Sequence, residues 1–141
     1  MKFHFLVLSV LIFNLNCNQS SDDDMTTEQI ITLKFNAIPN SFYLKTRAWG
    51  VNHEQIWLTK NKPKGISDKE TDYIFYCSEV FYKQTNDTIM IYAPQDLTLE
   101  PMEKFSEITV VIKGLANYDE IRDFDKNYGL NKVSTLDSHV T

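Results

Sequence analysis

The chain has 141 residues, of which 43% are hydrophobic and 23% charged, and its formal net charge at pH 7 is −5. This length suffices for one domain with a hydrophobic core. The acidic balance argues against nucleic-acid binding, which depends on neutralising phosphates, and against docking on an anionic lipid surface.

The first 24 residues predict an export signal followed by a polar tail. Lys2 precedes an apolar run over residues 5–13, and Cys17 follows that run after a short polar stretch. At about 9–11 residues the run is too short for a membrane-spanning helix, but it has the length of the hydrophobic region of a secretory signal. Residues 20–24 are Ser-Ser-Asp-Asp-Asp, a polar and acidic segment.

This segment resembles the signal of bacterial lipoproteins, whose cysteine becomes the acylated first residue of the mature chain. The acidic run also resembles the tethers of Gram-negative surface lipoproteins, and Asn18 differs from the Asp associated with retention in the inner membrane. The resemblance covers residues 1–24 only. It implies acyl chains, palmitate among them, on Cys17 and an outer-membrane location that faces the periplasm or the cell surface. The alternative is an uncleaved or ordinarily cleaved signal followed by a disordered linker.

Three segments are therefore expected: a signal peptide over 1–16, a lipidated Cys17 with a flexible acidic tether over 17–29, and a single β-rich domain over 30–141. Removal of residues 1–16 from the 141 leaves 125 and takes away Lys2, which changes the net charge from −5 to −6. With Cys17 acylated, Cys77 is the remaining thiol, so the domain would contain no disulfide. We expect Cys77 to be a small buried core residue.

From residue 30 the chain consists of short β-branched and aromatic runs bounded by turn residues, which predicts β-strands. The predicted strands are 30–35, 42–49, 55–59, 73–82, 88–93, 96–101 and 108–113, and 133–136 is a last short strand or a frayed tail. The intervening residues 84–87 are Gln-Thr-Asn-Asp, which predicts that 73–82 and 88–93 form a hairpin.

The sequence changes period near its end. Apolar and aromatic residues recur every three or four positions over Tyr118–Tyr128, Asn117 can cap the start, and Gly129 can end the element. A helix is therefore predicted there. With about six to eight strands and connections of hairpin length, we expect a mostly β fold, an antiparallel β-sandwich or an open barrel with one C-terminal helix.

The spacing of reactive side chains matches no catalytic or metal-binding pattern. The four glycines stand apart, and neither Cys-x-x-Cys nor His-Glu-x-x-His occurs. His53 and Glu54 are adjacent, and neighbours on a strand point to opposite faces, so they are poorly placed to share a metal ion. We therefore predict no enzyme, no metal and no cofactor.

An aromatic row on one predicted strand is the candidate ligand-facing site. Within 42–49, Tyr43, Arg47 and Trp49 lie on one face with Lys45, and the other face is apolar apart from one threonine. If the apolar face is the core, the row is exposed, and aromatic side chains beside a basic one can bind a glycan or a protein. The alternative is that a helix or a second sheet covers this face.

Thr88 is a candidate glycosylation site. Asn86-Asp87-Thr88 fits the Asn-x-Thr pattern, and Asp87-Thr88-Ile89 resembles a short O-glycosylation signal of exported proteins in some lipoprotein-rich bacteria. A hairpin tip is accessible to a glycan. The alternative is that these residues simply form the turn.

Taken together, these features predict a lipid-anchored cell-envelope protein that acts as a non-enzymatic binding module for a protein or a glycan. Two alternatives remain open: an immunity-like protein that neutralises an envelope toxin, and a small hydrolase. The hydrolase would require His53, Cys77 and a carboxylate to converge in one cleft.

Overall fold

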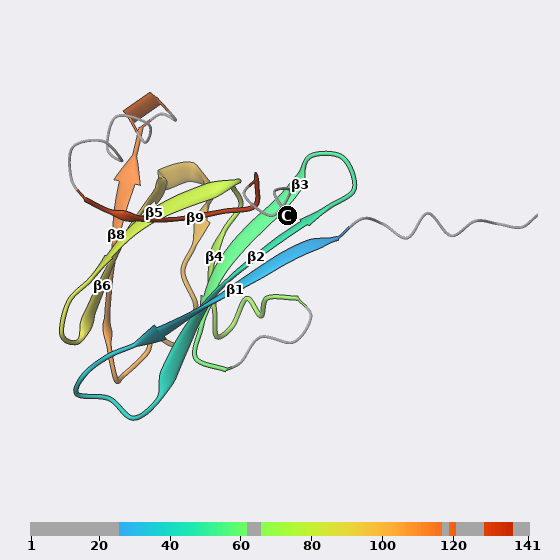
Figure 1. Ribbon diagram of the computed structural model, residues 1–141. Helices are drawn as coiled ribbons and strands as arrows, with labels where there is room; N and C mark the ends of the chain where they lie inside the picture. The colour runs from blue at the N-terminus through green and yellow to red at the C-terminus, as the bar shows by residue number, and fades with distance from the viewer. Residues whose placement is uncertain (1–25, 62–65, 117–118, 121–128, 137–141) are drawn as a thin grey trace, which may run out of the picture.

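The computed structural model describes residues 26–61, 66–116, 119–120 and 129–136, and this part of the chain is mostly β (Figure 1). It contains the following elements: β1 (Thr27–Lys34), β2 (Ser41–Trp49), β3 (His53–Thr59), β4 (Tyr73–Phe75), β5 (Glu79–Gln84), β6 (Thr88–Pro94), the 3₁₀ helix η1 (Gln95–Leu97), β7 (Thr98–Leu99), β8 (Thr109–Leu115) and β9 (Asn131–Ser134).

These strands form two sheets. The first, sheet A, has the order β1-β2-β3-β4-β7, and the second, sheet B, has the order β8-β6-β5-β9. The predicted mostly β class is confirmed. The two sheets stay separate, so the described strands do not close into a barrel.

One hydrophobic core is shared by the two sheets. Because side chains alternate between the faces of a strand, each sheet turns every second residue toward this core. Leu44 and Ile56 of sheet A and Ile89 and Ile91 of sheet B are all fully buried, and they belong to the same cluster. The sheets are therefore held to each other by apolar side chains from both.

The predicted single strand 73–82 is wrong, because the chain changes sheets within it. β4 ends at Phe75 in sheet A, and β5 begins at Glu79 in sheet B. Residues 76–78, which connect the two strands, form backbone hydrogen bonds with other parts of the chain. The Tyr76 N–H donates to the Leu97 carbonyl at 2.8 Å, and the Ser78 carbonyl accepts from the Thr135 N–H at 2.8 Å. Such a change of sheet cannot be recognised in the sequence, because the residues of β4 and the central residues of β5 are both buried and form one continuous apolar run.

The expected all-antiparallel pairing is also wrong, since β6 and β8 run parallel. Residues 95–108 between them contain η1 and β7, which lie where one strand 96–101 was predicted. A parallel pair needs such a long crossover, whereas an antiparallel pair can be joined by a tight turn. The crossover takes the chain through the edge of sheet A before it returns to sheet B.

The predicted hairpin is confirmed, and it joins β5 to β6. Gln84 pairs with Ile89, and the Thr85 N–H donates to the Thr88 carbonyl at 2.8 Å. The predicted helix Tyr118–Tyr128 is not seen: apart from Asp119 and Glu120 it lies outside the described residues, as do the signal and Cys17. No helix of the described segments is long and apolar enough to cross a membrane.

Candidate functional site

β2 turns one face to the core and the other away from it. Phe42 and Leu44 on the core face are fully buried, whereas Tyr43, Arg47 and Trp49 on the opposite face are half-buried. The condition for an accessible aromatic row, an apolar face that forms the core, is therefore met. We call the face of sheet A that points away from the core its outer face.

Lys45 lies in the same row but is buried, with 2% of its side chain exposed. Its ammonium is 2.9 Å from the Glu28 carboxylate and 5.3 Å from the centre of the Trp57 ring, which β3 places directly opposite Lys45. The charge is therefore compensated within the protein. Lys45 supports the sheet and is not accessible to a ligand.

Arg47, Trp49 and His53 form a group that we call the Trp49 cluster. The Arg47 guanidinium carbon is 5.2 Å from the centre of the Trp49 ring, a cation–π contact. The His53 ring stacks on Trp49 with 5.7 Å between centroids and 15° between planes. Glu28 Oε1 is 3.7 Å from Arg47 Nε, so one carboxylate lies between the two basic side chains of β2.

Sequence reasoning did not include His53 or Glu28 in the site. The predicted strand 55–59 begins after His53, yet His53 is the first residue of β3 and pairs with Trp49 across the short turn of residues 50–52. Glu28 was placed in the tether, but β1 begins at Thr27, before the expected domain start at residue 30. The turn of residues 50–52 is the sequence feature that could have placed His53 beside Trp49, because the two residues that flank a tight hairpin turn face each other.

The remainder of the outer face is covered. Gln55, Trp57 and Ile74 are buried although they point away from the core, and the Ser67 hydroxyl donates to Gln55 Oε1 at 3.1 Å. Ser67, which follows β3 in the chain, therefore lies over the β3 side of this face. The accessible part of the outer face is formed by β1, β2 and the first residues of β3, and Ile30 is 42% exposed there.

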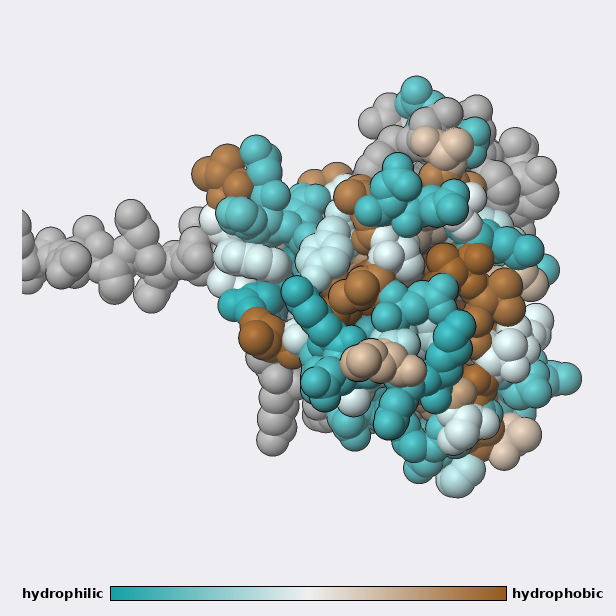
Figure 2. Space-filling model, turned by 180° about the vertical axis from the view of Figure 1, so that it is seen from behind, coloured by the Kyte–Doolittle hydropathy of each residue, from teal (hydrophilic) through white to brown (hydrophobic). Residues whose placement is uncertain are grey.

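Hydropathy alone does not single out a binding surface. On the side of the molecule shown in Figure 2, hydrophobic residues form patches that are interrupted by hydrophilic ones. Single exposed apolar residues are normal on protein surfaces. The arrangement of side chains on the outer face of sheet A is therefore more informative than the apolar area.

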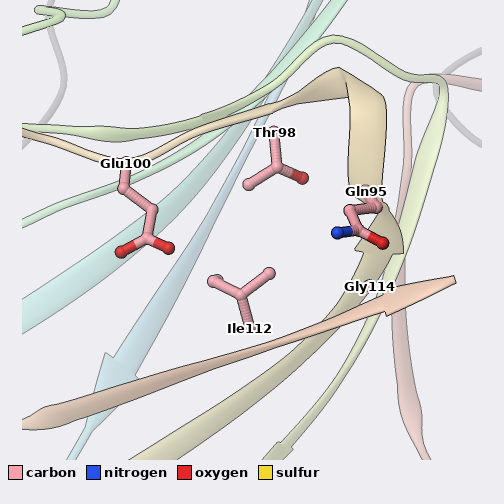
Figure 3. Close-up of a pocket in the computed structure, with 5 residues that line it drawn as sticks. All are labelled: Gln95, Thr98, Glu100, Ile112 and Gly114. Atoms are coloured by element: carbon pink, nitrogen blue, oxygen red, sulfur yellow. The ribbon is translucent and has the colours of Figure 1, made fainter.

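A shallow pocket of about 270 Å³ lies between the β7 edge of sheet A and β8 (Figure 3). Thr98 and Glu100 project into it from one side and Ile112 from the other. The Thr98 hydroxyl donates to the Pro94 carbonyl at 3.0 Å, and the Glu100 carboxylate is 2.8 Å from the Lys104 ammonium. That hydrogen-bonded pair raises the pKa of Lys104. These polar groups are thus already partnered within the chain.

The structure does not bring the reactive residues together. His53 is exposed on the outer face of sheet A, whereas Cys77 is buried in the core, where its thiol donates to the Glu79 carbonyl at 3.3 Å. Thr88 is half-buried at the start of β6, and its hydroxyl donates to Asp87 Oδ1 at 3.0 Å. Among the described residues, no group of three or more His, Cys, Asp or Glu side chains could hold a metal ion.

A comparison of the chain with models of protein families finds no match, and comparisons with curated proteins and with solved structures find none either.

Proposed function

We propose that this chain is a lipid-anchored cell-envelope protein whose two sheets form a β-sandwich that binds a protein or a glycan without catalysing a reaction. One observation carries the binding proposal. Tyr43, Arg47 and Trp49 are partly exposed on the open part of the outer face, while the β2 residues Phe42, Leu44, Lys45 and Thr46 are buried.

The chemistry of this row suits recognition. Tyrosine, tryptophan and arginine are the residue types that most often dominate the binding energy of protein interfaces. Arg47 is held by the Trp49 ring and by Glu28, so part of its rotamer freedom is already lost before a partner arrives. Such preorganisation lowers the entropic cost of binding.

The anchor rests on the lipoprotein-like signal that ends at Cys17. Two or three acyl chains would hold the protein durably, whereas one chain alone binds a membrane only marginally. The test is the intact mass of the protein recovered from membranes after expression of the full gene, beside a Cys17→Ala variant. A chain that begins at Cys17 with added acyl mass is expected, and a chain of unmodified mass that the substitution leaves unaffected would contradict the anchor.

The binding surface is tested by placing a photoreactive benzoylphenylalanine at position 43 in cells that express the full gene. We expect a discrete cross-linked product that disappears when Arg47→Ala is added, because both side chains belong to the same accessible row. The matched control carries the photoreactive residue at position 102, since Met102 is 87% exposed and lies outside this surface. Equal products from both positions would contradict the proposal.

Retention of the purified protein on envelope polysaccharide, compared with the Tyr43→Ala variant, distinguishes a glycan from a protein partner. Retention that Tyr43→Ala abolishes would identify a glycan. A cross-linked product of discrete mass without such retention would identify a protein.

A further inference from the structure

The turn between β2 and β3 projects from the end of sheet A at which β1 begins. Gly50 and Asn52 adopt positive φ values of 59° and 64°, which leaves Val51 at the tip with 83% of its surface exposed. Trp49 and His53 pair at the base of the turn. The tip thus combines an apolar side chain with an amphipathic aromatic one directly behind it.

The register of β1 on β2 places this turn next to the start of the folded domain. Thr27, the first residue of β1, pairs with Ala48, which directly precedes Trp49. Figure 1 shows the beginning of β1 and the β2–β3 turn at the same end of sheet A. An anchor on the chain just before β1 would therefore keep the β2–β3 turn close to the anchoring surface as well.

The chain before β1 is short. Nine residues separate Cys17 from Thr27, the first residue of β1, and a chain of nine residues spans at most about 30 Å when extended and about 15–18 Å as a flexible coil. If acyl chains on Cys17 lie in a bilayer, the turn cannot move far from its surface. This step rests on the anchor of the proposed function.

We propose that the β2–β3 turn touches the lipid bilayer, with Val51 at the boundary of the acyl chains and the Trp49 indole at the level of the headgroups. Tryptophan is enriched at this depth because its ring is apolar and its N–H is polar. His53 stacks on the indole and would therefore lie next to the headgroups with it. A zwitterionic bilayer is the expected surface, because the chain as a whole is acidic.

The contact depends on the anchor for its strength. A single valine and one indole bury too little apolar surface to hold a free domain on a membrane, but a tether converts the contact into an intramolecular one at high effective concentration. The contact would orient the domain rather than recruit it. Trp49 would then contact the bilayer, whereas Tyr43 and Arg47, farther along β2, would remain accessible to a partner.

The chain supplies its own reporter for this contact. Its two tryptophans are Trp49 and Trp57, and Trp57 is buried with 1% exposure. In the Trp57→Phe variant, Trp49 is the single fluorophore. The full gene is expressed, the acylated protein is purified from membranes, and it is reconstituted in phosphatidylcholine vesicles that carry a doxyl quencher near the headgroups.

We expect the vesicles to quench the Trp49 emission by roughly half, as for an indole at the headgroup boundary, and Val51→Asp to reduce this quenching about threefold because a carboxylate avoids the acyl boundary. Met102→Asp is the matched control and leaves quenching unchanged. Met102 is about as exposed as Val51. It lies in the segment before Glu107, which pairs with Lys60 next to the end of β3 that is opposite the turn.

The outcomes separate the two proposals. A protein without acyl mass overturns the anchor and the bilayer contact together. An acylated protein whose Trp49 emission is not quenched, or is quenched equally in the Val51→Asp and Met102→Asp variants, overturns the bilayer contact alone. Loss of the position-43 cross-link in Val51→Asp with unchanged quenching would show that the turn meets a protein instead. If Trp57→Phe does not fold, both aspartate variants are compared in the chain with both tryptophans, where Trp57 adds a constant background.

Discussion

Glu28 determines how much positive charge β2 presents to a partner. Its carboxylate pairs with the buried Lys45 at 2.9 Å and with Arg47 at 3.7 Å. Burial makes the first pair necessary, because an ammonium that is withdrawn from water needs a nearby opposite charge. Arg47 keeps 25% of its side chain exposed and is the basic group of this row that can reach a ligand.

Gly114 is required by a close approach between η1 and β8. A Cβ at this position would lie 2.9 Å from the Gln95 Cβ. We expect Gly114→Ala to lower the free energy of unfolding by about 1–3 kcal/mol, because the two elements must move apart. Urea denaturation measures the loss. Gln95→Gly added to Gly114→Ala should recover part of it, and a further loss in the double variant would show that the contact is not the cause.

Two buried tyrosines predict a loss of stability at high pH. Burial raises the pKa of Tyr73 and of Tyr82 above the usual 10.0, because the phenolate would lose its hydration. The stabilisation is complete below the pKa of the unfolded chain and is lost as the pH rises through the raised pKa of the folded state. The urea midpoint should therefore be insensitive to these groups at pH 7–9 and should fall above about pH 10.

Tyr73→Phe and Tyr82→Phe are the matched variants for this pH dependence. Each removes one ionisable hydroxyl and keeps the ring in the core, so the urea midpoint of each should fall less steeply than that of the wild-type chain above pH 10. A decline as steep as that of the wild type in both variants would assign the effect to other groups.

At the scale of elements, the backbone N–H groups of β8 fall into two sets: one set points to β6, and the other points away from it. The Thr109 N–H donates to the Asp87 carbonyl at 2.8 Å, so Thr109 turns its N–H toward β6. Alternate residues of a strand direct their N–H groups to the same side. The N–H groups of Val111 and Lys113 therefore point to β6, whereas those of Val110 and Ile112 point to the edge that β8 forms among the described strands of sheet B.

Amide hydrogen exchange should reveal this alternation. We expect slow exchange at Val111 and Lys113 and faster exchange at Val110 and Ile112, because an N–H that is bonded within a sheet exchanges only after local opening. The measurement is NMR of the folded protein in heavy water. Equal protection along the whole strand would mean that a further strand, from this or another chain, covers the edge.

Element boundaries could be predicted only where turn chemistry marks them. The segment Gln-Thr-Asn-Asp predicted the β5–β6 hairpin correctly because its residues favour a turn, and Thr85, Asn86 and Asp87 form the loop. The crossing between β4 and β5 has no such mark: Tyr76-Cys77-Ser78 continues the apolar run, and only the packing of each half in a different sheet breaks the strand. Local preference cannot report which sheet a strand joins.

At the scale of the whole molecule, the shared core predicts that the two sheets unfold as one cooperative unit. Leu44 from sheet A is fully buried in the same cluster as Ile91 from sheet B. We expect Leu44→Ala to lower the free energy of unfolding by about 2–5 kcal/mol, because the lost side chain leaves a cavity between the sheets.

Two probes test the cooperativity. Tryptophan fluorescence reports on sheet A, which contains both Trp49 and Trp57, and far-UV circular dichroism reports on all strands. The two urea transitions should therefore coincide and shift together in Leu44→Ala. Thr32 is an exposed residue on the outer face of β1, so Thr32→Ala is the control and should shift both transitions little. Separate transitions would show that the sheets unfold independently.

The candidate site shows the same division between local pattern and packing. Alternation along 42–49 correctly grouped Tyr43, Arg47 and Trp49 on one face, since a strand has a period of two wherever it is placed. The burial of Lys45 and the contributions of Glu28 and His53 required the neighbouring strands, because their positions follow from register with β2.

The sequence by itself determined what depends on near neighbours along the chain: the β-rich class, most of the strands, the β5–β6 hairpin and the residues that share a face of β2. The tertiary structure alone decided the parallel pairing of β6 with β8, the change of sheet after Phe75 and the pairing of Glu28 with Lys45. The physical reason is that a strand satisfies its backbone hydrogen bonds equally well beside several partners. The choice among them is made by the apolar surface that the whole chain can bury at once.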